Sequence, residues 1–224
     1  MSEITKDVVK ETIVNAKELL EEAEILFEKG KYPRTYVLAV LSAEEFSKAF
    51  LYRAVLAGII NYERISKDLL NHDKKLYHEI HVISGMYAYL VMRDRLLESL
   101  EHDKGKPHSE HEFLNEMSHG LYHVLLDEKH PLHKEFTRIL DSLKGAHQKK
   151  KKALYVEIND HIISRPKDAV TQEEAKYLIE LLNNQSPHFS TIIDFDDERF
   201  AKMVVWLHPE LFREERKPEL SIPY

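Results

Sequence analysis

LAVLSAEEFSKAFLYRAVLAG, residues 38–58, reads as one helix with apolar side chains around most of its circumference. Apolar residues on all sides are typical of a helix that is buried among other helices. Three charged residues, Glu44, Glu45 and Lys48, nevertheless lie near its middle. Lys48 is four residues from Glu44 and three from Glu45, so either glutamate can pair with it along the helix. The pattern therefore favours a polar seam of paired ions between helices, and a catalytic site is the alternative.

A second helix precedes this one, over residues 5–29. Its apolar residues recur at alternating intervals of four and three, as in a heptad stripe: Val9, Ile13, Ala16, Leu20, Ala23 and Phe27. Gly30 suits the position just after a helix, and Pro33 suits the first turn of the next one. Because the connection is so short, we expect the two helices to be antiparallel neighbours.

The rest of the chain is predicted to be mostly helical. Capping boxes at Ser109 with Glu112 and at Thr171 with Glu174 mark two helix starts. Further helices are expected over residues 62–72, 74–102, 109–127, 131–150, 171–183 and 196–206. Residues 154–158, LYVEI, alternate apolar and polar side chains and are predicted to be extended.

These elements predict an all-α fold with an antiparallel bundle of four or five helices. Residues 1–153 would form this bundle, with residues 103–135 as a variable His-rich insertion. Residues 154–224 would add the short extended segment and a small helical extension that packs on the bundle without forming an independent domain.

Composition excludes several classes of function. Among 224 residues there is no cysteine, so disulfides and thiol catalysis are ruled out. Six glycines and no phosphate-loop motif argue against a nucleotide-binding loop. A net charge of -7 argues against non-specific coating of DNA. No apolar run is long enough for a membrane span or a secretory signal, so we expect a cytoplasmic protein.

No metal or cofactor is expected. His119 with His123 and His78 with His81 have helical metal-ligand spacing, but no HExxH motif accompanies them, which favours solvated imidazoles. A di-iron bundle needs Glu-x-x-His on two helices, whereas Lys48 stands three residues after Glu45.

Four consecutive lysines, residues 149–152, precede the extended segment. Such a run can be the solvated end of a helix, where it interacts favourably with the helix dipole. It can also contact phosphate groups, with Tyr155 nearby to stack on an unpaired base. The sequence leaves both interpretations open.

Three motifs in order give the chain a resemblance to a known family. Glu44, Glu45 and Lys48 match a Glu-Glu-x-x-Lys pattern on a helix rich in small residues, and His72 with Lys75 match a later His-x-x-Lys pattern. The third motif is KKKKALYVE, which contains Lys151, Lys152 and Tyr155. Together they resemble the AbiV-type abortive-infection proteins of the helical HEPN group.

This resemblance implies a bacterial antiphage protein, and for many HEPN domains a homodimeric, metal-independent endoribonuclease. The HEPN active site is an Arg and a His separated by four to six residues. Arg95 and His102 have six residues between them and share one helix face. Histidine can transfer protons near neutral pH, and arginine can neutralise charge on the scissile phosphate.

Other mechanisms remain open beside this one. Leu96 follows Arg95, where the family pattern usually has a polar residue, and Lys152 with Tyr155 are alternative phosphate contacts. A non-catalytic effector would instead bind a phage or host protein and block phage maturation or translation. In either case we expect a homodimer.

We also expect the Glu44, Glu45 and Lys48 cluster to lock its helix to the segment carrying His72 and Lys75. If Lys48 is a buried partner, Lys48→Ala should lower the free energy of unfolding by about 3–5 kcal/mol.

Overall fold

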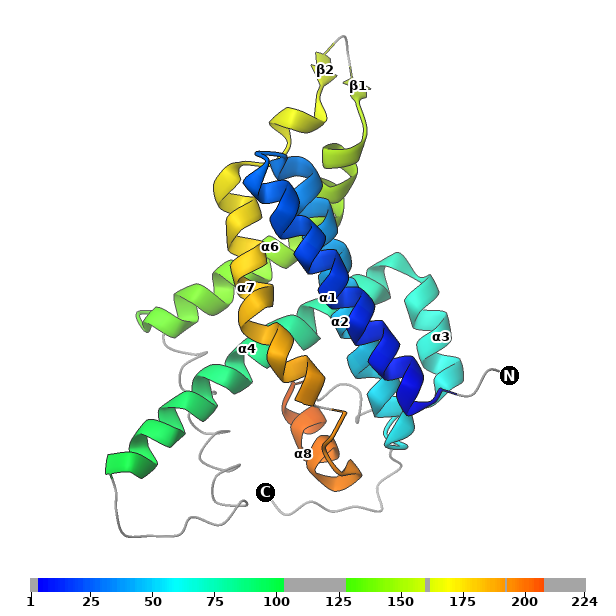
Figure 1. Ribbon diagram of the computed structural model, residues 1–224, viewed down its shortest axis with the longest axis vertical. Coiled ribbons are helices and arrows are strands. Elements are labelled where there is room, and N and C mark those ends of the chain that lie inside the picture. Colours follow the sequence, from blue (N-terminus) through cyan, green and yellow to red (C-terminus); the bar gives the residue numbers. More distant parts are fainter. Residues whose placement is uncertain (1–3, 103–127, 160–161, 192, 208–224) are drawn as a thin grey trace.

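The computed structural model of the chain describes residues 4–102, 128–159, 162–191 and 193–207. Its helices in chain order are α1 (Lys6–Glu28), α2 (Tyr32–Leu56), α3 (Tyr62–Leu70), α4 (His72–His102), α6 (Pro131–Leu154), α7 (Gln172–Thr191) and α8 (Asp197–Leu207). One hairpin of two short strands, β1 (Glu157–Asn159) and β2 (Ile162–Ser164), and a 3-10 turn, η1 (Pro166–Asp168), separate α6 from α7 (Figure 1). The all-helical character predicted from the sequence is confirmed. The helix expected over residues 109–127 lies outside the described residues.

The α1–α2 hairpin forms as its sequence pattern predicts. Thr5 caps α1 by accepting a hydrogen bond from the Val8 backbone N–H at 3.3 Å. Gly30 follows the C-cap residue Lys29 with φ of +68°, a left-handed conformation that glycine adopts without steric cost. The heptad stripe of α1 is buried from Val9 to Ala23 and partly buried at Phe27, and α1 packs against α2.

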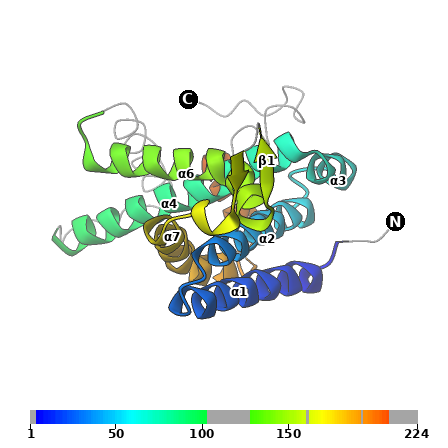
Figure 2. The same ribbon diagram turned by 90° about the horizontal axis from the view of Figure 1, so that it is seen from above.

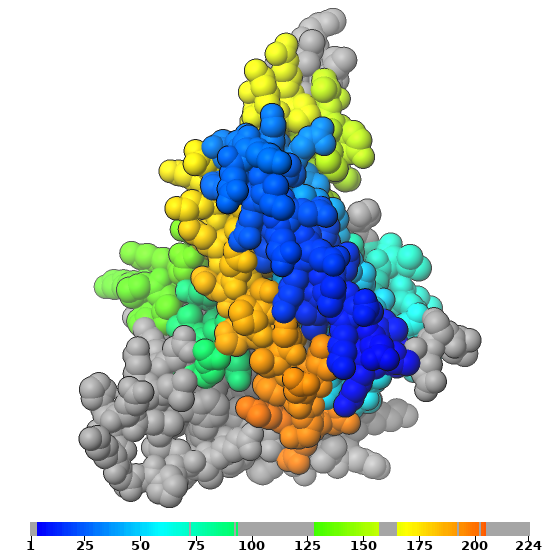
Figure 3. Space-filling model, viewed as in Figure 1, coloured from blue at the N-terminus to red at the C-terminus, as the bar shows by residue number. Residues whose placement is uncertain are grey.

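One hydrophobic core around α2 contains residues from all seven of the described helices. Helix α2 contacts α1, α4, α6 and α7, and α1 and α7 lie side by side across one face of the molecule (Figures 2 and 3). Phe46 of α2 and Phe189 of α7 stack with ring centroids 4.7 Å apart, and both are fully buried. Helix α7 is therefore part of the bundle core.

Two helices extend further than the sequence predicted. Helix α7 was expected to end near residue 183, but it continues through Pro187 to Thr191. Burial of Phe189 against Phe46 offsets the backbone hydrogen bond that proline removes. Helix α6 continues past residue 150 to Leu154, since lysines in a last turn interact favourably with the helix dipole. Extended backbone then starts at Tyr155, and the β1–β2 hairpin projects beyond the helices (Figure 1).

Helix α8 is anchored to α2 by a buried arginine. Arg53 is almost fully buried, donates a hydrogen bond to the Phe195 carbonyl at 2.7 Å and forms an ion pair with Asp197 at 2.9 Å. Its guanidinium also lies 4.7 Å from the centre of the Phe200 ring. Asp196 caps α8, because its side chain accepts from the Arg199 N–H at 2.8 Å. None of the described helices is both long enough and apolar enough to cross a lipid bilayer.

Candidate functional site

A buried cluster of ionisable side chains joins α2, α4 and α6. We call it the Glu44 cluster; it consists of Glu44, Lys75, Glu79, His147 and Lys150. Glu44 lies on α2 with its side chain only 4% exposed, and it accepts a hydrogen bond from the Lys75 Nζ at 2.5 Å. Its other carboxylate oxygen accepts from the Lys150 ammonium and lies 3.5 Å from the His147 Nε2. Burial raises the pKa of Glu44, but the hydrogen bonds from Lys150 and Lys75 outweigh it and lower the pKa below its ordinary value.

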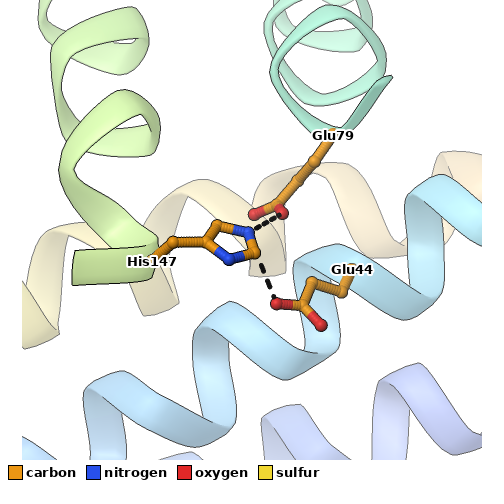
Figure 4. Close-up of side chains that lie close together, drawn as sticks. All are labelled: Glu44, Glu79 and His147. Atoms are coloured by element: carbon orange, nitrogen blue, oxygen red, sulfur yellow. Dashed lines mark hydrogen bonds and ion pairs between the residues drawn. The ribbon is translucent and has the colours of Figure 1, made fainter. Parts of the chain in front are cut away.

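Glu79 of α4 is the second carboxylate of the cluster, and its side chain is 1% exposed. Its Oε2 lies 3.2 Å from the His147 Nε2 (Figure 4). Its Oε1 is buried and has no hydrogen-bond partner among the described residues. Burial raises the pKa of Glu79, although the hydrogen bond to His147 opposes this, and the nearby Glu44 carboxylate raises it further.

The other two residues of the Glu-Glu-x-x-Lys motif lie closer to the surface. Lys48 Nζ is 2.5 Å from a Glu45 oxygen, with the side chains 28% and 20% exposed. Of the two pairs that the sequence allowed, the i,i+3 pair forms, whereas Glu44 pairs with Lys75 and Lys150. The expectation that the motif residues lock α2 to the segment carrying Lys75 is thus confirmed for Glu44. It is wrong for Lys48, whose ion pair stays within α2.

His72 and the Arg95/His102 pair all lie on α4, but their side chains are outside the part of the chain that the structure describes. The match of Arg95 and His102 to the HEPN pattern therefore stays a prediction.

The four-lysine run is divided between two environments. Lys149 pairs with Glu174 of α7, and Lys150 pairs with the buried Glu44. Lys151 and Lys152 are exposed at the end of α6, as is Tyr155 just beyond it. Neither interpretation of the run describes all four lysines, because successive residues of a helix point about 100° apart.

A second group of buried charges ties α3 to the start of α4. Asp68 accepts from Lys74 at 2.8 Å, and its carboxylate lies 3.3 Å from the His78 Nε2 and 3.9 Å from the Arg64 Nε. Burial raises the pKa of Asp68, but the hydrogen bonds to Lys74 and His78 outweigh it and lower the pKa.

A cleft of about 470 Å³ lies between α4, α6 and α7, and Arg93 and His188 both line it. The Arg93 Nη1 of α4 lies 3.3 Å from the His188 Nδ1 of α7. Arg138 of α6 also lines this cleft, with its guanidinium 3.9 Å from the centre of the Tyr177 ring. We call it the His188 cleft.

Sequence reasoning missed Glu79, His147 and the Arg93–His188 pair. A signal for Glu79 did exist, since it shares an apolar helix face with Val82, Ile83 and Met86, all of them buried. A titratable residue within such a stripe must find a partner on another helix. Nothing in the sequence indicated that His188 faces Arg93, because the two residues are 95 positions apart.

The described residues form a helical bundle with a buried polar cluster, and comparison with known families assigns this bundle to a HEPN-like helical domain. A family model described as AbiV matches residues 5–185, which covers the chain from α1 almost to the end of α7 and includes all three motifs. The chain therefore belongs to the AbiV family of HEPN abortive-infection proteins. No curated protein and no solved structure matches it.

Proposed function

We propose that this protein is a bacterial abortive-infection effector that cleaves RNA in the infected cell as a homodimer. The family supports the role in phage defence. The observation that carries the mechanism is the Arg93–His188 pair in the His188 cleft. A histidine and an arginine in one cleft can supply the proton transfers and the charge neutralisation for RNA cleavage without a metal ion.

The chemistry follows from these side chains. The RNA 2′-hydroxyl attacks the adjacent phosphorus and loses its proton, the bond from phosphorus to the 5′-oxygen breaks, and the leaving oxygen gains a proton. His188 is suited to these proton transfers because imidazole titrates near neutral pH. Arg93 and Arg138 remain charged and are placed to neutralise the phosphorane oxygens. The products are a 2′,3′-cyclic phosphate and a 5′-hydroxyl.

Arg95 and His102 are the competing catalytic pair within the same proposal. They lie on the C-terminal part of α4, which extends past α7 in Figure 1. A second copy that docked on this part of α4 would bring two such pairs together, as the resemblance to HEPN nucleases implies.

The test is cleavage of total RNA by purified protein in EDTA. We expect cleavage products with cyclic phosphate ends, and at least a hundredfold loss of rate in His188→Ala and in Arg93→Ala, within the usual range for removing an acid–base group. Arg34→Ala is the matched control, because Arg34 is an exposed arginine on α2. If only Arg95→Ala and His102→Ala lowered the cleavage rate, Arg95 and His102 would be the catalytic pair instead. Absence of any cleavage would overturn the ribonuclease proposal.

The molecular mass in solution tests the proposed dimer. Light scattering should give about twice the chain mass of 26.4 kDa. A mass near 26.4 kDa at micromolar concentration would contradict it.

A second function is favoured by a different observation. Leu154, Tyr155 and Val156 are three consecutive apolar residues that are exposed at the base of the projecting hairpin. Exposed apolar residues that are contiguous are typical of protein interfaces. In this alternative the protein does not cleave RNA, and it binds a phage or host protein through this surface, which blocks phage maturation or translation.

Two variants distinguish the two proposed functions. Tyr155→Ser with Val156→Ser should abolish phage protection and co-purification of a specific protein during infection, if the hairpin surface binds the partner. His188→Ala should abolish protection if RNA cleavage is the mechanism. Full protection by the hairpin variant would contradict the binding alternative.

A further inference from the structure

We propose that Glu44, Glu79 and His147 bind one first-row divalent transition-metal ion, for which Zn²⁺ is the suitable probe. The three side chains come from α2, α4 and α6 and converge on one space (Figure 4). Each offers one ligand atom, and these atoms all lie within 4.8 Å of one another. Two carboxylates and an imidazole form a donor set that suits Zn²⁺ and similar ions.

The distances are close to those of a coordinated ion. The His147 Nε2 lies 3.2 Å from a Glu79 oxygen and 3.5 Å from a Glu44 oxygen. Ligands held about 2.0–2.1 Å from a tetrahedral zinc are about 3.3 Å apart. Small side-chain movements would therefore suffice to close the three atoms around an ion.

A separate observation supports a cation in this space. Glu79 is buried, and its Oε1 has no hydrogen-bond partner among the described residues. The two lysines of the Glu44 cluster both donate to Glu44, whereas the Glu79 carboxylate contacts the His147 ring. A buried carboxylate oxygen without a partner is costly, and metal coordination is one of the two usual ways to satisfy it.

Lys150 is the competitor for this site. Its ammonium donates to the same Glu44 oxygen that lies nearest His147, so Lys150 must move when an ion binds. The Lys150 side chain is 16% exposed and flexible, and it can reach solvent. Lys75 donates to the other Glu44 oxygen and can stay in place, where it orients the carboxylate. The cluster is thus occupied either by the Lys150 ammonium or by a metal ion.

The location suggests that the ion would act as a clamp. It would join three core helices at one point, away from the residues that line the His188 cleft. Three protein ligands leave one coordination position for water. This site is therefore independent of the proposed ribonuclease chemistry.

Calorimetric titration of Zn²⁺ into full-length protein stripped with EDTA tests the proposal. We expect one equivalent of Zn²⁺ that disappears in Glu79→Gln and in His147→Ala, and an increase in melting temperature on binding. His81→Ala is the matched control, because this histidine lies two residues from Glu79 but outside the cluster. The histidines in residues 102–133 can also take up zinc, so the measured quantity is the equivalent that each variant removes.

Lys150→Met provides an independent test that does not depend on removing a ligand. Loss of the competing ammonium should tighten Zn²⁺ binding by about tenfold, while Lys48→Met should leave it unchanged. Equal binding in Lys150→Met and the unmodified chain, or an unchanged number of equivalents in folded Glu79→Gln or His147→Ala, would overturn the proposal. If Glu79→Gln and His147→Ala both fail to fold, the Zn²⁺ affinity of Lys150→Met is the deciding measurement.

Discussion

Two adjacent glutamates of one motif have opposite environments. Glu44 is 4% exposed and pairs with lysines on two other helices, whereas Glu45 is 20% exposed and pairs with Lys48 on its own helix. A step of one residue rotates the side chain by about 100° around α2. The difference teaches that a sequence motif on a buried helix can combine a tertiary anchor with a surface ion pair, and only the former should matter much for stability.

The largest expected effect comes from removing both cations that face Glu44. Lys75→Met with Lys150→Met keeps most of the apolar stems but leaves a buried carboxylate uncompensated. We expect the free energy of unfolding to fall by about 3–5 kcal/mol, as for other broken buried pairs. Urea unfolding in EDTA measures this loss. Adding Glu44→Gln to the double variant should restore much of the lost stability. If the double variant lost less than about 1 kcal/mol, Glu44 would not need its two cations.

Asp68 is a smaller buried anchor, which joins α3 to α4. Asp68→Asn should lower the free energy of unfolding by about 1.5–3 kcal/mol at pH 7, because it weakens charged hydrogen bonds to Lys74 and His78. The folded pKa of Asp68 is lowered, so its contribution is complete above its ordinary value of 3.8 and is lost as pH falls through the folded value.

Urea unfolding at several pH values tests this. The difference between Asp68→Asn and the unmodified chain should shrink below about pH 4, where Asp68 becomes protonated. A difference that stayed unchanged through this acidic range would contradict the ionised state of Asp68.

Thr171 and Glu174 provide a local interaction for comparison. The Thr171 hydroxyl accepts from the Glu174 N–H at 3.2 Å, and the Glu174 carboxylate accepts from the Thr171 N–H at 2.9 Å. Thr171→Ala should cost about 1 kcal/mol, the usual effect of losing an N-cap. Thr171→Ser is the matched control, and it should retain nearly all of the stability in thermal unfolding.

The smallest effect is expected for the surface half of the motif. Lys48 is 28% exposed and pairs with a partly exposed Glu45, so Lys48→Ala should change the free energy of unfolding by less than about 1 kcal/mol. The penalty of 3–5 kcal/mol that a buried partner would carry thus belongs to Lys75 and Lys150. A large loss in Lys48→Ala, measured by urea unfolding, would erase the contrast between the two glutamates.

The sequence determined most of the helices and several of their starts, but not the ends of α6 and α7. Periodicity located α1 and α2, Gly30 and Pro33 marked their connection, and a capping box marked the start of α7. These features depend on residues within a few positions of one another, which is why they can be read locally. The family also followed from three motifs in order, and the family match over residues 5–185 confirms it.

The tertiary structure decided which ions meet. Glu44 lies 31 positions from Lys75 and 106 from Lys150, and the sequence offered Lys48 as a nearer partner. Packing of α4 and α6 against α2 brings the distant lysines, Glu79 and His147 to Glu44. The physical reason is that a helix fixes which face a side chain occupies, while the identity of its partner depends on the helix that covers that face.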